Sequence, residues 1–179
     1  MFAHNYKYAL VSYKYSTERV LAGQAKAFKF WSRTGGAFVN NIDKAMARSL
    51  LGQAQLGLCK FSEEALVNLA GERPVAIFFL EDVFTHLTED EQHAILLHEE
   101  GHVALGHLEV TKPGLRHELE ADAYAAKQVG KKVVRSALLS LVRNFFAVTI
   151  GAGPKLSAVL TAISIAGSPS MLIRLWKLS

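Results

Sequence analysis

The sequence predicts an α+β domain that is mostly helical and contains a small sheet. The 179 residues are half hydrophobic, which is enough for one core and short for two, so a single domain over residues 1–179 is expected. The run from Pro74 to Leu80 is the clearest β-like segment. Helical patterns with capping residues at their starts dominate elsewhere.

The N-terminal part is expected to begin with a strand and to continue with helices. Residues 6–15 alternate and are rich in Tyr and Val, which favours a strand. A mostly apolar helix is predicted over residues 16–32. Asp43 opens a second helix, and a capping pattern predicts a third over residues 62–70.

The C-terminal part is expected to be helical. Two apolar helices are predicted over residues 131–148 and 156–166, and Pro169 suits the first turn of a final helix. Charged residues and Pro154 interrupt this region, so no apolar stretch reaches the roughly 18 to 20 residues that a membrane-spanning helix needs. We therefore expect no transmembrane segment.

The compartment is predicted from two further observations. The N-terminus shows no signal-peptide pattern. The single cysteine, Cys59, has apolar neighbours and is interpreted as a core thiol, which fits a reducing compartment. A cytoplasmic location is therefore expected.

The segment that carries the functional prediction is AILLHEEGHVALGH, residues 94–107. On a helix, His98 and His102 are about 40° apart around the axis, so both imidazoles can reach one metal ion. Glu99 lies roughly 60° from His102, where its carboxylate can meet a metal-bound water without being a ligand. This is the H-E-x-x-H arrangement of zinc hydrolases. Apolar flanks and a capping box at residues 88–91 favour a buried helix.

A catalytic zinc site needs a third protein ligand, with the fourth position left to water. Glu118 is the expected ligand, in a downstream stretch of helix-forming composition. Asp122 shares one helix face with it and is expected to hydrogen-bond the far nitrogen of a ligand histidine. His117 and Glu120 remain alternatives to Glu118.

Two other histidines are not expected to bind the metal. In the longer three-histidine pattern the third histidine would occupy the position of Leu108, and the glycine is shifted to Gly106, so that pattern is excluded. His107 is therefore interpreted as a residue at the end of the helix. His93, five residues before His98, points to another side of the helix and is interpreted as structural.

These motifs resemble the gluzincin peptidases of the HtpX and CAAX prenyl protease type. The likeness rests on the H-E-x-x-H segment that begins at His98 and on the segment Glu118-x-x-Ala121-Asp122. In that family an E-x-x-x-D helix supplies the third zinc ligand and its supporting aspartate. The resemblance implies a mostly helical, zincin-like metallopeptidase core over residues 63–179, preceded by a helical and strand region over residues 1–62.

The resemblance extends to both sides of these motifs. Pro74–Leu80 and the LTEDE sequence at residues 87–91 are similar to the family's lead into the site helix. The segment from Ser168 to Arg174 is similar to its closing H-P-S-x-x-x-R segment, with Ser168 where a histidine is common. The short gap after His102 is closer to the ImmA/IrrE-type peptidases. The resemblance also implies that the strand over Val75–Phe79 binds substrate by backbone pairing as an extra strand.

Charge is distributed in three blocks that sum to a net charge of +4. The net charge is +7 over residues 1–62, −11 over residues 63–122 and +8 over residues 123–179. The acidic block suits a cation site. We favour mutual neutralisation of the blocks in the folded protein, so no nucleic-acid partner is expected, although the basic flanks leave one open.

The expected function is zinc-dependent endopeptidase activity on a polypeptide substrate. Zn²⁺ held by His98, His102 and Glu118 would acidify its bound water, and Glu99 would act as the general base. One alternative is a non-catalytic zinc-binding interaction protein with the peptidase fold. Another is an adaptor whose basic flanks bind nucleic acid or an anionic membrane surface.

Overall fold

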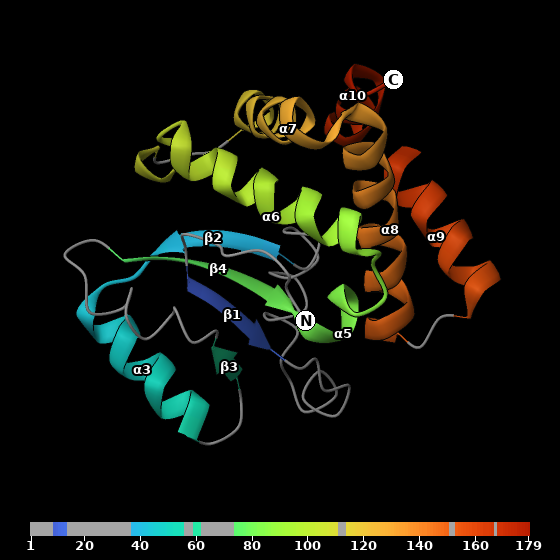
Figure 1. Cartoon of the computed structure of the whole chain (residues 1–179). Helices are drawn as coiled ribbons and strands as arrows, with labels where there is room; N and C mark the ends of the chain where they lie inside the picture. The colour runs from blue at the N-terminus through green and yellow to red at the C-terminus, as the bar shows by residue number, and fades with distance from the viewer. Residues whose placement is uncertain are drawn as a thin grey trace.

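The structure is a computed structural model, and it describes residues 9–13, 37–55, 59–61, 74–110, 114–150, 153–166 and 168–179. These residues are mostly helical and include a four-stranded mixed sheet, as expected of an α+β protein (Figure 1). The strands are β1 Ala9–Tyr13, β2 Ala37–Asn41, β3 Cys59–Phe61 and β4 Val75–Leu80. The helices are α3 Lys44–Gln55, α5 Glu81–Phe84, α6 Glu89–Ala104, the 3-10 helix η1 His107–Glu109, α7 Leu115–Val129, α8 Lys131–Ile150, α9 Pro154–Ala166 and α10 Pro169–Lys177.

The sheet has the strand order β2-β4-β1-β3. Strand β4 pairs in parallel with β1 and antiparallel with β2, so that Phe78 lies opposite Val11 on one side and Phe38 on the other. Both edges of β4 are therefore occupied. The prediction that Val75–Phe79 binds a substrate as an added strand is wrong, because its backbone N–H and C=O groups already serve the sheet.

The two faces of β4 contribute to two different cores. Ile77 and Phe79 belong to the larger apolar cluster, together with residues of α6 and α8. Ala76 and Phe78 face the other way, toward Leu50 of α3. Figure 1 shows the same arrangement, with α3 on one side of the sheet and α6 on the other. The alternation follows from the two-residue period of a strand, and it explains why the whole strand is apolar.

Several local expectations are confirmed. Strand β1 lies within residues 6–15, and Asp43 accepts a hydrogen bond of 2.7 Å from the Met46 N–H at the start of α3. Cys59 is buried. Pro169 occupies the first turn of α10. The helices predicted over residues 16–32 and 62–70 lie outside the described residues.

Helix α6 begins with the expected capping box. The Glu91 N–H donates to Thr88 Oγ1, and the Thr88 N–H donates to Glu91 Oε2. The other oxygen of Glu91 accepts hydrogen bonds from Ser136 and Ser140 of α8, at 2.7 and 2.8 Å. One carboxylate therefore caps α6 and also joins it to α8.

Helices α6 and α7 approach closely at Gly101. A Cβ at this position would lie 3.1 Å from the Cβ of Tyr124 and 3.2 Å from the backbone of Ala121. The lack of a side chain therefore lets α7 pack against the face of α6 that carries the H-E-x-x-H motif. Among the described helices, none is long and apolar enough to cross a membrane.

Candidate metal centre

Helix α6 holds the two histidines of the motif in the interior. His98 and His102 are 6% and 9% exposed, and their Nε2 atoms lie 3.2 Å apart. The carboxylate of Glu118, on α7, lies 3.5 Å from His98 Nε2 and 3.6 Å from His102 Nε2. These three donor atoms lie within 4.8 Å of one another and could hold a metal ion.

The two alternatives to Glu118 are directed elsewhere. His117 Nδ1 accepts a hydrogen bond from the Gly114 N–H, and Glu120 lies 3.1 Å from His107 Nε2. In the part of the chain that the structure describes, Glu118 is the carboxylate that completes a possible metal-binding group with His98 and His102. Helical spacing explains the difference, because residues 117 and 120 project from α7 in directions other than that of Glu118.

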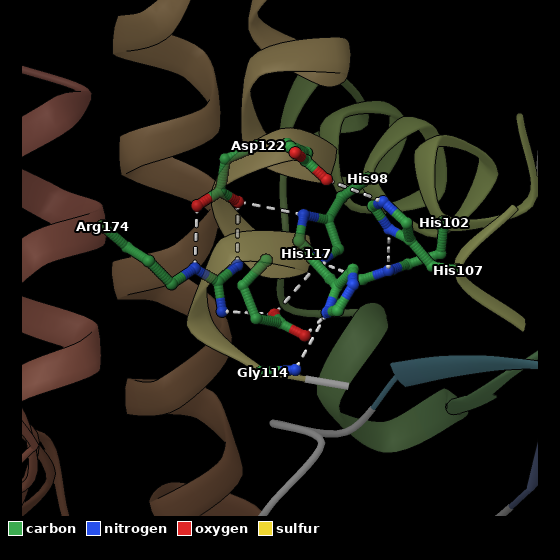
Figure 2. Close-up of polar contacts among 9 residues, drawn as sticks. His98, His102, His107, Gly114, His117, Asp122 and Arg174 are labelled. Atoms are coloured by element: carbon green, nitrogen blue, oxygen red, sulfur yellow. Dashed lines mark hydrogen bonds and ion pairs between the residues drawn. The ribbon is translucent and has the colours of Figure 1, made fainter. Parts of the chain in front are cut away.

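A carboxylate lies behind His98. Its Nδ1 lies 2.9 Å from Asp122 Oδ1. Arg174 of α10 donates to both oxygens of Asp122, at 2.7 and 2.8 Å, and its Nη1 lies 2.8 Å from Glu118 Oε2. Figure 2 shows Asp122 between His98 and Arg174. One arginine therefore fixes both the candidate ligand Glu118 and the residue that orients His98.

These contacts shift the pKa values on this side. Burial alone would lower the pKa of His98, but the carboxylates of Asp122 and Glu118 outweigh it and raise that pKa to about 9. Burial would raise the pKa values of Glu118 and Asp122, but Arg174 and His98 hold both at about 2. His98 is therefore protonated in the metal-free protein, and a metal ion that bound its Nε2 would displace that proton.

His102 is supported by a different kind of residue. Its Nδ1 lies 3.0 Å from Nδ1 of His107, which is 6% exposed in η1. Nε2 of His107 lies 3.1 Å from Glu120 Oε2, and Arg116 donates to the other oxygen of Glu120 at 2.8 Å. Burial lowers the pKa of His102 to about 4, and the positive charge of His98 acts in the same direction. His102 is therefore neutral at neutral pH, as a metal ligand must be.

Glu99 is buried beside this group and does not belong to it. Burial raises the pKa of its carboxyl group to about 7, despite an opposing effect from the charge of His98. Its carboxylate also accepts a hydrogen bond from the backbone N–H of Val39, on β2. A carboxyl group with such a pKa can both accept and release a proton near neutral pH.

The donor set fits a divalent cation. Two imidazole nitrogens and one carboxylate are the ligands that catalytic metal sites of this size use. The imidazoles are held on their far side, by Asp122 and by His107, as metal-bound histidines usually are. The two Nε2 atoms and the Glu118 carboxylate face one another, and a cation bound among them would interact favourably with all three.

Three participants were not assigned to the site from the sequence. Arg174 was noted only as part of the closing segment, His107 was interpreted as a helix-end residue, and the backbone of Val39 carries no sequence signal. Arg174 lies 52 residues from Asp122, so no local spacing connects them. The available sequence signal for His107 was a further histidine five residues after the second histidine of H-E-x-x-H.

Comparisons with known proteins yield no match: no family model, no curated protein and no solved structure corresponds to this chain.

Proposed function

We propose that this chain is a zinc-dependent endopeptidase with a zincin-like, gluzincin-type site. The observation that carries the proposal is the convergence of His98, His102 and Glu118, with the buried Glu99 next to the first of them. Zinc is the metal we infer, because two histidines and one glutamate form a known catalytic zinc set. When bound, zinc supplies a Lewis acid that acidifies a water molecule and polarises a peptide carbonyl.

The protein's own groups would then perform the proton transfers. Glu99 takes a proton from the attacking water on a carboxylate oxygen as the new C–O bond forms. It delivers that proton to the amine nitrogen as the C–N bond breaks. Asp122, held by Arg174, keeps His98 oriented toward the site throughout.

A polypeptide substrate would bind along β2 in this proposal. Strand β2 is an edge strand of the described sheet, with β4 as its one neighbour there, and it contacts α6. In the described sheet, its second edge has no partner strand. An extended peptide can pair with such an edge and reach the site helix. β4 cannot take this role, for the reason given above.

The test is cleavage of an unstructured polypeptide by zinc-loaded protein, followed by mass spectrometry. Wild type should cut, and a chelator should stop it. Glu99→Gln should retain zinc and lose activity by about 100-fold or more, because the base is removed and the ligands are kept. Glu100→Gln is the matched control, since Glu100 bonds to Tyr124 and takes no part in the chemistry. Full activity of Glu99→Gln would remove Glu99 from the base role.

One contact favours the alternative of a non-catalytic zinc-binding interaction protein. The hydrogen bond from Val39 occupies the Glu99 carboxylate, which then joins α6 to β2. Under this alternative Glu99 is a structural residue. Zinc-loaded wild type would then cut no peptide, and Glu99→Gln would lower the melting temperature.

A further inference from the structure

His107 forms part of a chain of contacts that leads from His102 to the surface. His102 Nδ1 and His107 Nδ1 are 3.0 Å apart, and His107 Nε2 is 3.1 Å from Glu120. The side chains of His107 and Glu120 are 5% and 38% exposed. The chain therefore begins at a buried candidate ligand and ends at a carboxylate in contact with solvent.

Only one placement of protons satisfies every member of this chain when His102 binds a metal through Nε2. The proton of a neutral His102 must then lie on Nδ1, because Nε2 uses its lone pair for the metal. His107 Nδ1 must accept that proton's hydrogen bond, so His107 carries its own proton on Nε2. Glu120, as a carboxylate, accepts from that Nε2–H.

We infer that His107, held by Glu120, is a positioning residue that selects the metal-binding tautomer of His102 and directs its Nε2 toward His98 and Glu118. This inference rests on the proposed metal site and does not depend on peptidase activity. If His107 carried its proton on Nδ1, two N–H groups would face each other across 3.0 Å. Glu120 disfavours this arrangement, because its carboxylate lies next to Nε2 and stabilises a proton there.

The backbone and a neighbouring ring hold His107 in this place. Gly106 has a φ of +73°, a left-handed conformation that glycine adopts readily, and it turns the chain from α6 into η1. The ring of His117 lies 4.7 Å from that of His107 at 69°, and the Gly114 N–H donates to His117. Figure 2 shows His107 beside His102 and His117. Such a fixed ring can orient its neighbour.

The first test measures metal affinity by competition between the protein and a chelator for Zn²⁺, and with Co²⁺ by its visible spectrum. His107→Leu fills a similar volume with an apolar side chain and removes the acceptor nitrogen, so affinity should fall by about 10- to 100-fold. His107→Asn can place an amide oxygen near the position of Nδ1 and should recover most of that loss. Equal losses in both variants would indicate mere packing and would overturn the inference.

The second test uses the exposed end of the chain, where a change does not endanger folding. Glu120→Ala should lower Zn²⁺ affinity and alter the Co²⁺ spectrum. Glu109→Ala is its control, because it removes the same charge from an exposed position on η1. Equal affinities for Glu120→Ala and Glu109→Ala would overturn the inference, whether or not the His107 variants fold.

The third test observes the tautomers directly. Two-bond ¹H–¹⁵N correlation spectra of the zinc-loaded protein should show His102 protonated on Nδ1 and His107 protonated on Nε2. His107 protonated on Nδ1 would overturn the inference. Failure of wild type to bind Zn²⁺ in the competition experiment is a different result, because it would refute the metal site itself.

Discussion

The two candidate histidine ligands have different environments, although they are one helical turn apart. Behind His98 lie Asp122 and Arg174, whose side chains are 3% and 12% exposed. Behind His102 lies the buried His107, which in turn contacts the exposed pair Glu120 and Arg116. The pKa of His98 is raised to about 9, and the pKa of His102 is lowered to about 4.

Because of this difference, the two sides should contribute differently to the stability of the fold and to metal affinity. The buried side consists of Asp122 and Arg174 behind His98, and it joins α6, α7 and α10. These charged groups have little water around them, so removing one of them leaves the charge of its partner uncompensated. The solvent side consists of His107, Glu120 and Arg116 behind His102, and it joins the end of α6 to η1 and the start of α7. The charges of Glu120 and Arg116 remain hydrated. We therefore expect the buried side to determine stability as well as metal affinity, and the solvent side to affect affinity alone.

The largest effect is expected from Asp122→Ala compared with Glu120→Ala. Asp122→Ala removes one partner of a buried ion pair and should lower the free energy of unfolding by about 3 kcal/mol. Glu120→Ala should leave the stability of the metal-free protein unchanged. Urea unfolding of both metal-free variants measures this. Equal losses would show that the two sides are not distinct.

A second prediction concerns the helix that supports both sides. Gly101→Ala places a Cβ against Ala121 and Tyr124, so α7 must move by a few tenths of an ångström and carry Glu118 with it. Metal affinity should fall about tenfold, the lower end of the effect of disturbing a ligand's support. Stability should change little, because the cost of displacing α7 is offset by alanine's preference for a helix over glycine, about 1 kcal/mol.

The matched control for that variant is Gly52→Ala on α3, where a Cβ meets nothing within 4 Å. It should show the gain in helix stability alone, with unchanged metal affinity. Chelator competition and thermal unfolding of the two variants give both quantities. Unaltered affinity in Gly101→Ala would mean that α7 accommodates the methyl group without moving Glu118.

A third prediction uses Glu91 as a buried carboxylate remote from the metal ligands. Burial would raise the pKa of Glu91, but hydrogen bonds from Ser136, Thr88 and Ser140 outweigh it and lower that pKa below its ordinary value. Because the pKa is lower in the folded state, the stabilisation is present at neutral pH and disappears as the pH falls through the lowered value.

Glu91→Gln should therefore cost about 1 kcal/mol at neutral pH, the usual value for a helix cap. The difference from wild type should shrink as the solution is acidified. Urea unfolding over a series of pH values below neutrality checks this. A constant difference would show that Glu91 acts through packing and not through its charge. The loss in Asp122→Ala should exceed that in Glu91→Gln.

The smallest expected effect is that of salt. Charges in water are screened over about 8 Å at physiological ionic strength, and buried pairs are screened much less. The effect of Glu120→Ala on Zn²⁺ affinity should therefore diminish severalfold as salt is added, whereas that of Asp122→Ala should persist. Chelator competition at low and high salt measures both ratios. Parallel changes would contradict the distinction between a buried and a hydrated side.

Features with short-range signals were predictable. The capping box at Thr88 and Glu91 is confirmed, as is the strand that became β4. The four-residue spacings placed His98 with His102, and Glu118 with Asp122, because a helix repeats its faces at that interval. The three side chains chosen from these spacings, His98, His102 and Glu118, lie together in the structure.

Features that depend on chain segments meeting at long range were not predictable in this way. The apolar sequence of β4 shows burial but not which strands flank it, so its central place in the sheet was missed. His107 reaches His102 through the turn at Gly106, which a helical pattern does not describe. The pairs Arg174–Asp122 and Lys60–Glu81 agree with the expected neutralisation between charge blocks, but charge counts do not choose the partners.

The position of Arg174 has a consequence for biosynthesis. The ligands on α6 and α7 leave the ribosome well before the residue that fixes Glu118 and Asp122, which follows Asp122 by 52 residues. A nascent chain that has just completed α7 already contains the three candidate ligands but not Arg174, which contacts Glu118 and Asp122. We therefore expect the ordered cluster to form late in translation, after α8 and α9 have been made.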